Sequence, residues 1–227
     1  MPTQYLAPAI AAAFALIGFL PLAGQSVRRP LLWLCLIAGG VAGFFARQAV
    51  AMAGDALAPV RALAVEPASS IFSLVVAAVV GEVLKALAPL AAIVSRPADA
   101  RTGLGYGAAS GAGFGFVVAQ QGLGMALGLA GSPFITPAST VIAVAGWFFR
   151  ILPQIVTTAY VGRAGVVGGL VGALLFAILI QVVLSLADRL PLVGGIPTGV
   201  IVTALVSIIL YVYLWIRRTR AAMPPVR

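Results

Sequence analysis

Histidine is absent from the 227-residue chain, cysteine occurs once, at Cys35, and charged residues make up only 8% of the sequence. Without histidine, the chain cannot supply histidine ligands to haem or chlorophyll, or the base of a Ser-His or Cys-His nucleophile. Zinc sites built from cysteine and histidine are excluded for the same reason, and one cysteine cannot form an internal disulfide. We therefore expect no catalytic triad, no metal site and no cofactor.

The scarcity of charge also excludes a soluble globular protein, in which about 25% of residues are charged. Hydrophobic residues make up 62% of this chain and the mean hydropathy is +1.14. The apolar runs are continuous over about 20 residues, which indicates membrane-spanning helices rather than the alternating segments of a β-barrel. The sequence predicts an all-α, polytopic transmembrane helical bundle that forms one integral membrane domain over residues 1–227.

The apolar runs predict about seven crossings of the membrane. They cover residues 6–23, 31–46, 69–94, 103–120, 138–161, 165–187 and 195–216. Residues 122–137 are apolar but short, and their GSPFITP stretch contains two prolines, so we interpret this segment as a re-entrant or short helix. The alternative is that the same segment forms an eighth crossing. Either interpretation raises the number of helices to eight.

The basic residues predict how the bundle is oriented. The net charge of +9 would suggest a nucleic acid partner in a soluble protein, whereas here we attribute it to the positive-inside rule and expect no nucleic acid. If the short basic tail at residues 217–227 is cytoplasmic, seven crossings place nine arginines inside and three outside. We therefore expect an integral protein of a prokaryotic plasma membrane, with its N-terminus outside and its C-terminus in the cytoplasm.

Glycine recurs at every fourth position in the fourth predicted span, at Gly103, Gly107, Gly111 and Gly115. This spacing aligns the four residues on one helix face, where the lack of side chains lets a neighbouring helix approach closely. The motif is weakly specific, and we favour packing within one bundle over a role in dimerisation.

Three charged residues fall at membrane depth, where an unpaired charge costs several kcal/mol. Glu82 and Lys85 are three residues apart on one helix and are expected to pair. Arg150 lies near the middle of another span, just before Pro153 and Gln154, and we predict that it contacts Glu82 across the helices. We favour a buried tether between helices; a catalytic or transport centre in a water-filled cavity is the alternative.

The order of three motifs resembles the PrsW-like intramembrane proteases of the CAAX-protease (CPBP) superfamily. The similarity covers about residues 70–170 and includes GEVLKALAPL at 81–90, GLGYGAASGAGFGFVVAQ at 103–120 and FRILPQIVTTAYVGRAG at 149–165. Within them, the residues that match the family motifs are Glu82, Lys85, Tyr106, Gly107, Gly113, Phe114 and Gly162. The resemblance implies a transmembrane bundle in which glutamate and histidine side chains cleave membrane-embedded substrates.

The same comparison shows that the family's reactive residues are replaced. Gly81 stands at the first glutamate of the first motif, and Gln154 stands where the histidine is expected. The glutamate and asparagine of the second motif fall on Val118 and Ala119, with Gln120 one residue further on. Neither glutamine nor valine can act as a general base, so the resemblance implies a pseudoprotease with a vestigial polar centre.

We therefore predict a non-catalytic scaffold or accessory subunit of a membrane protein complex. Its expected partners are the lipid bilayer and another membrane protein. One alternative is an active PrsW-like protease with a rearranged site that uses Glu82 with Gln120 or Gln154. A further alternative is a small-solute or ion transporter with Glu82, Lys85 and Arg150 along its path.

Overall fold

A computed structural model describes residues 3–61, 66–129, 136–193 and 196–220 of the chain. In this part of the chain, seven helices are long and apolar enough to cross a membrane. They are α1 (Thr3–Ala23), α2 (Pro30–Ala56), α4 (Ala68–Ser95), α5 (Ala100–Leu129), α6 (Pro137–Val167), α7 (Leu170–Ala187) and α8 (Thr198–Arg220). The expected all-α polytopic bundle is thus confirmed, and the chain is an integral membrane protein with lipid around its helices.

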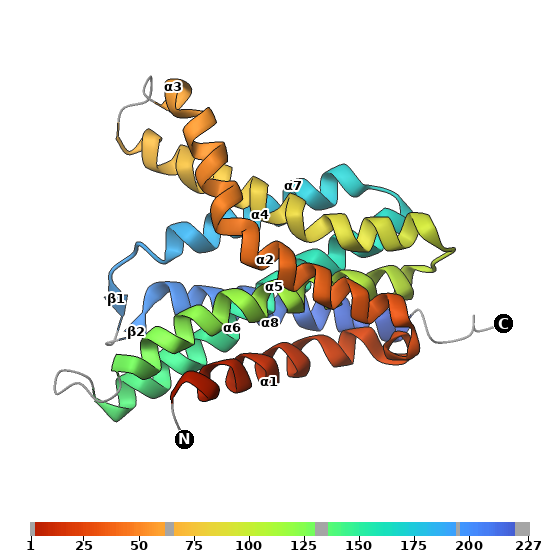
Figure 1. The fold of residues 1–227 in the computed structure, drawn as a ribbon, viewed down its shortest axis with the longest axis horizontal. Coiled ribbons are helices and arrows are strands. Elements are labelled where there is room, and N and C mark those ends of the chain that lie inside the picture. The colour runs from red at the N-terminus through yellow and green to blue at the C-terminus, as the bar shows by residue number, and fades with distance from the viewer. Residues whose placement is uncertain (1–2, 62–65, 130–135, 194–195, 221–227) are drawn as a thin grey trace.

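Short elements connect the spans. The 3-10 helix η1 (Gly24–Arg28) follows α1, the four-residue helix α3 (Ala58–Arg61) follows α2, and strands β1 (Leu192–Val193) and β2 (Ile196–Pro197) pair antiparallel before α8. Residue type explains several boundaries: Pro30 and Pro137 open their helices, where their missing N–H groups would have no partner in the helix. α1 begins at one end of the bundle and α8 ends at the other (Figure 1).

The segment at residues 122–137 differs from our expectation. Residues 122–129 continue α5 as regular helix instead of forming a separate re-entrant element, and residues 130–135 lie outside the described residues. The short helix in the described part of the chain is instead α3. Glycine did not interrupt α5 because a helix satisfies its backbone hydrogen bonds within itself, which a membrane segment requires.

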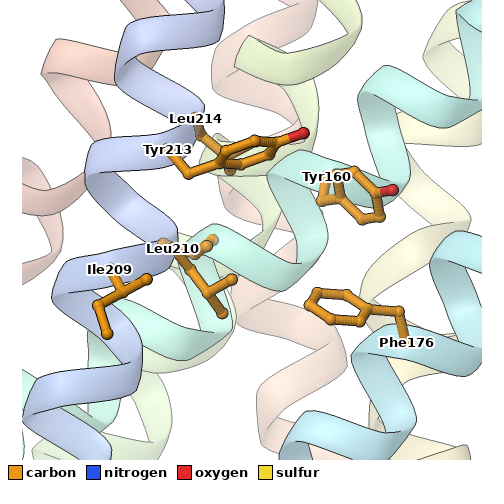
Figure 2. A pocket seen from close by; sticks show the side chains of 7 residues that line it. Tyr160, Phe176, Ile209, Leu210, Tyr213 and Leu214 are labelled. Atoms are coloured by element: carbon orange, nitrogen blue, oxygen red, sulfur yellow. The ribbon is translucent and has the colours of Figure 1, made fainter.

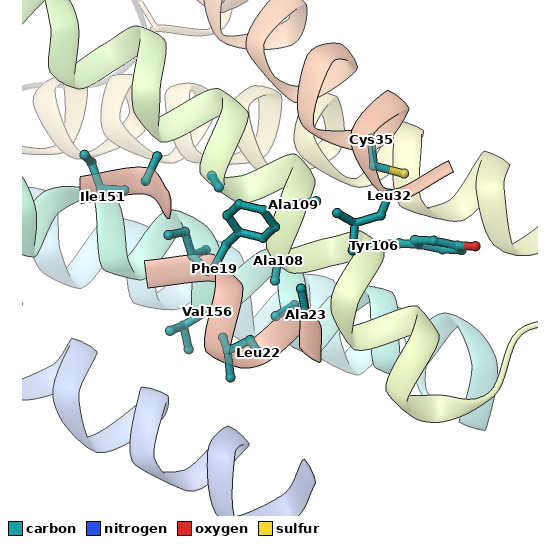
Figure 3. Close-up of a cluster of buried hydrophobic side chains, with 14 of the residues drawn as sticks. Phe19, Leu22, Ala23, Leu32, Cys35, Tyr106, Ala108, Ala109, Ile151 and Val156 are labelled. Atoms are coloured by element: carbon teal, nitrogen blue, oxygen red, sulfur yellow. The ribbon is translucent and has the colours of Figure 1, made fainter. Parts of the chain in front are cut away.

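α5 is the central helix of the bundle, with α1, α2 and α6 packed around it (Figure 1). Every residue from 102 to 115 is buried, as expected for a helix enclosed on all sides. Figure 3 shows the result, with Phe19 of α1 and Leu32 of α2 beside Ala108 and Ala109 of α5. The small residues of α5 let its neighbours approach until their larger side chains meet.

The four predicted packing glycines all face α6. A Cβ atom at Gly107 would collide with the backbone carbonyl of Thr158, and one at Gly111 with that of Gln154. Gly103 is similarly close to Gly162, whereas Gly115 faces the side chain of Ile151. The backbones of α5 and α6 therefore touch along three turns, which fixes the position of the α6 residues described below.

A glycine pair forms the boundary between α6 and α7. Gly168 and Gly169 have φ angles of +91° and +84°, a left-handed conformation that other residues adopt at a cost. The chain reverses direction there and returns as α7 beside α4. This reversal brings the polar residues of α7 next to those of α4.

Candidate functional site

The intramembrane charges are paired on α4. Glu82 and Lys85 are each only 1% exposed, and the Lys85 Nζ lies 2.5 Å from the Glu82 Oε1. Their separation of three residues places both side chains on one helix face, as the sequence predicts. The pair lies near the middle of the span, where an unpaired charge would be costly.

A second helix completes the surroundings of the ammonium group. The Lys85 Nζ donates a 2.6 Å hydrogen bond to the Gln154 Oε1 of α6, and it also lies 5.3 Å from the ring centroid of Phe114 of α5. The Gln154 Nε2 in turn donates to the Gln181 Oε1 of α7 at 3.3 Å. A chain of polar contacts therefore links α4, α6 and α7.

Hydroxyl groups hold the neighbouring backbone in place. The Ser110 Oγ of α5 donates to the Lys85 carbonyl at 2.7 Å, and the Thr157 Oγ1 donates to the Pro153 carbonyl at 2.8 Å. The Thr157 hydroxyl also lies 3.4 Å from the Glu82 Oε1. Pro153 lacks an N–H and so loosens the α6 backbone here, and bonds from side chains to carbonyls are the usual compensation in a membrane.

A cavity of about 170 Å³ adjoins these residues. It is lined by Leu74, Ala77, Ala78, Gly81, Glu82, Lys85, Phe114, Gln154, Gln181 and Ser185. Two buried polar atoms of its lining, the Glu82 Oε2 and the Gln181 Nε2, have no hydrogen-bond partner within the described residues. Two residues of the cavity lining thus each carry a buried polar atom, one a charged acceptor and one a neutral donor, that is left without a partner in the described structure.

The cavity lies where α4 and α7 separate. The two helices touch at Ala86, which packs against Ala173 and Ala177. Further along, Gln181 and Ser185 of α7 face the first half of α4 across the open space. Leu74 and Ser185 at its rim are partly exposed, so the cavity opens sideways between the spans.

The residue types around the cavity limit the chemistry that they can supply. The described residues contain no cluster of three His, Cys, Asp or Glu side chains that could hold a metal ion. The Lys85 ammonium group occupies the Glu82 Oε1 at 2.5 Å, and the neighbouring amides cannot accept a proton near neutral pH. The Glu82 Oε2 and the Gln181 Nε2 are the polar atoms here that have no partner within the described residues.

A larger hollow of about 350 Å³ has a different character. It lies between α6, α7 and α8 and is lined by Val156, Tyr160, Phe176, Ile209, Leu210, Tyr213 and Leu214. In Figure 2 the rings of Tyr160 and Phe176 lie opposite the side chains of α8. None of its lining residues is charged, so this hollow offers an apolar surface rather than a reactive centre.

The predicted contact between Glu82 and Arg150 is wrong. The Arg150 Nη2 instead lies 2.9 Å from the Asp188 Oδ1 just after α7, and its guanidinium lies 5.1 Å from the ring centroid of Trp147. Because the two side chains are 40% and 37% exposed, Arg150 stands apart from the polar centre. The prediction considered only the acid at membrane depth, whereas Asp188 caps the C-terminal end of α7.

Gln120 also lies outside the polar centre. It is exposed on α5, and Val118, at the position of the family's second-motif glutamate, is 37% exposed. Of the polar residues that the sequence singled out, the structure brings together Glu82, Lys85 and Gln154. Positions 118 and 120 lie one turn or more beyond Phe114 along α5, and this displacement along the helix axis carries them away from the site.

The sequence analysis did not identify Gln181 and Ser185 as site residues. A signal existed, because they are the two polar side chains of the α7 sequence LVGALLFAILIQVVLSLA and are four residues apart. That spacing places them on one face of the helix. Their contribution to the cavity depends on α7 lying beside α4, which no local pattern indicates.

The exposed Arg150–Asp188 pair is expected to contribute little to stability. Replacing Arg150 with methionine should change the free energy of unfolding by no more than about 1 kcal/mol, because a partly exposed pair pays little desolvation and contributes little net attraction. Thermal unfolding of the purified protein in detergent would measure this change. A loss several times larger would show that Arg150 does participate in a buried network.

Comparison with protein-family models, curated proteins and solved structures gives no match for this chain. The resemblance to PrsW-like proteases remains a prediction from the sequence motifs.

Proposed function

We propose that this protein is a non-catalytic membrane scaffold, an accessory subunit that binds a helix of another membrane protein at the cavity between α4 and α7. The observation that supports this proposal is the pair of unpartnered atoms in that cavity. Lys85 occupies one oxygen of Glu82, while the Glu82 Oε2 and the Gln181 Nε2 remain buried without a hydrogen bond in the described structure. Such atoms are costly unless a partner satisfies them.

The position of the cavity favours a partner within the membrane. Its opening lies between two spans and is bordered by the apolar side chains of Leu74 and Ala77. A soluble protein cannot reach this depth, whereas a helix in the bilayer can approach sideways. A serine, threonine or glutamine on that helix would donate to Glu82, and such bonds between helices contribute about 0.6–2 kcal/mol each in membranes.

The residue types at the site support a function without catalysis. In the family that the sequence resembles, the position of Gln154 carries a histidine, and an amide cannot take over proton transfer. Gln154 is instead bound to Lys85 at 2.6 Å, in a contact that joins helices. We therefore propose that the architecture of an intramembrane protease serves here to bind rather than to cleave.

Filling the cavity tests this proposal. Ser185→Phe places a ring in the cavity, whereas Val183→Phe on the same helix adds a ring at a position that is 43% exposed. In a pull-down from native membranes in mild detergent, we expect a stoichiometric membrane partner with the natural protein and with Val183→Phe, and its loss with Ser185→Phe. Recovery of the natural protein as a pure monomer, or equal partner retention by both variants, would refute the scaffold.

One observation also favours a second candidate, an intramembrane protease with a rearranged centre. Glu82, whose Oε2 has no partner in the described structure, lines a cavity whose volume of about 170 Å³ admits several waters, at about 30 Å³ each. If the carboxylate activates such a water, Glu82→Gln combined with Lys85→Met, which removes both buried charges, should abolish cleavage of membrane-embedded peptides while most of the protein stays folded. Absence of peptide turnover by the natural protein would favour the scaffold.

A further inference from the structure

A second polar pocket lies at the end of the bundle where α1 ends and α2 begins. Its volume is about 520 Å³, and it is lined by Ala23, Gln25, Ser26, Arg28, Arg29, Asp99, Arg101, Thr102 and Arg218. These residues come from η1, from the connection before α5 and from the last turns of α8. Figure 1 shows the ends of α1 and α8 at the same end of the bundle. Three segments far apart in sequence thus meet at one charged pocket.

The pocket has a strong excess of positive charge. Four arginines line it against one aspartate, a net charge of +3. In the described part of the chain, the ion pairs within 4.0 Å are those of Lys85 and Arg150, so none of the four guanidinium groups is neutralised by direct contact with a carboxylate there. Cations held together in this way favour binding of an anion.

Asp99 is already engaged at the start of α5. Its Oδ1 accepts a 2.7 Å hydrogen bond from the Thr102 backbone N–H, and its carbonyl accepts one from Gly103. Bonds from Thr102 hold the pKa of Asp99 below its ordinary value, so the carboxylate stays ionised as the helix cap. The positive end of the α5 dipole also faces this region, which adds to the attraction for an anion.

The fold makes room for this arrangement. Gly24 has a φ of +50°, and a Cβ atom there would collide with the guanidinium of Arg218. Gly105 leaves space for Ser26, which is buried beside it. The pocket therefore depends on two glycines that let α8 and η1 come close to each other and to α5.

Aromatic residues indicate the depth of the pocket in the membrane. Trp33 in the first turns of α2 is 40% exposed and donates to the Val27 carbonyl at 2.9 Å. Trp215 near the end of α8 is 49% exposed. Partly exposed tryptophans at helix ends mark the boundary between lipid and water, so the pocket lies at the level of lipid headgroups.

We infer that this pocket binds the phosphate of an anionic lipid headgroup, held by Arg28, Arg29, Arg101 and Arg218. Arginine forms paired hydrogen bonds with phosphate oxygens, and basic pockets between membrane helices are suited to such headgroups. The lipid is favoured over a free phosphate ion because the pocket lies beside exposed apolar helix surface, where acyl chains can lie. This site is separate from the cavity at Glu82 and does not depend on the proposed scaffold function.

Lipid titration of the purified full chain tests this inference. Binding is measured by native mass spectrometry and by thermal unfolding in an uncharged detergent, with phosphatidylcholine, phosphatidylglycerol and phosphatidic acid as probes. We expect the two anionic lipids to bind and stabilise more strongly than phosphatidylcholine. Each lost guanidinium should weaken anionic binding about fivefold, which corresponds to about 1 kcal/mol per charge.

The test uses Arg101→Gln with Arg218→Gln, and Arg96→Gln as the matched control. Arg96 lies exposed just after α4 and does not line the pocket, so its loss removes one charge nearby. Selective loss of anionic lipid in the double variant alone supports the site. Equal weakening by Arg96→Gln, or no preference for anionic lipid, would overturn it. Displacement of the lipid by millimolar inorganic phosphate would overturn the lipid assignment in favour of the free ion.

Discussion

Replacing Lys85 with methionine is expected to lower the free energy of unfolding by about 3–5 kcal/mol. The substitution leaves Glu82 at 1% exposure without its cation, and Gln154 without the donor at 2.6 Å. The charge remains in an apolar interior, and its full desolvation cost then falls on the folded state. Thermal unfolding in detergent, together with the yield of monodisperse protein, would measure the loss.

A double variant distinguishes the effect of an unpaired buried charge from general damage to α4. Lys85→Met combined with Glu82→Gln removes both charges, so we expect the double variant to recover most of the stability lost in Lys85→Met. Arg150→Met provides the control for an exposed pair, since its partner Asp188 is 37% exposed. If the single Lys85 variant is as stable as the natural protein, the pair does not hold the helices together.

Substituting alanine for Gly107 is the second change with a large expected effect. The new Cβ atom would collide with the Thr158 backbone carbonyl of α6, and a backbone cannot move aside as a side chain can. The two helices must separate, which we expect to cost about 3 kcal/mol or more, at the upper end for overpacked cores. Because Gln154 and Thr157 lie on the displaced helix, the polar centre should be disrupted as well.

Gly124→Ala on the same helix is the matched control. Nothing lies within 4 Å of a Cβ atom at that position, so alanine should be neutral or stabilising by up to about 1 kcal/mol through its better helix propensity. The comparison is made by thermal unfolding and by the fraction of folded protein after detergent extraction. Equal effects at the two positions would mean that α5 tolerates side chains at its contact with α6.

The spans and part of the polar centre could be predicted from local patterns. Hydropathy identifies the seven membrane helices because the bilayer demands about 20 apolar residues in each. The Glu82–Lys85 pair followed from a spacing of three residues on one helix. Residues 122–129 were misassigned because glycine and nearby prolines suggested a break, whereas α5 continues through that stretch as regular helix although only Gly122 and Leu123 of it are buried.

Contacts between distant segments could not be predicted in the same way. Arg150 was predicted to contact Glu82, and its actual contact with Asp188 depends on where α7 ends relative to α6. Gln154 reaches Lys85 across 69 residues of sequence, and Gln181 joins them from a third helix. Each contact requires the rotation and depth of two helices, which hydropathy leaves undefined.

Composition and spacing alone established a helical membrane bundle with a paired charge at its centre and closely packed glycines, because each of these features follows from the bilayer or from a single helix. The cavity between α4 and α7, the true partner of Arg150 and the arginine pocket at the end of the bundle came only from the packed structure. Their residues lie on separate helices, and only packing of those helices sets the distances between them.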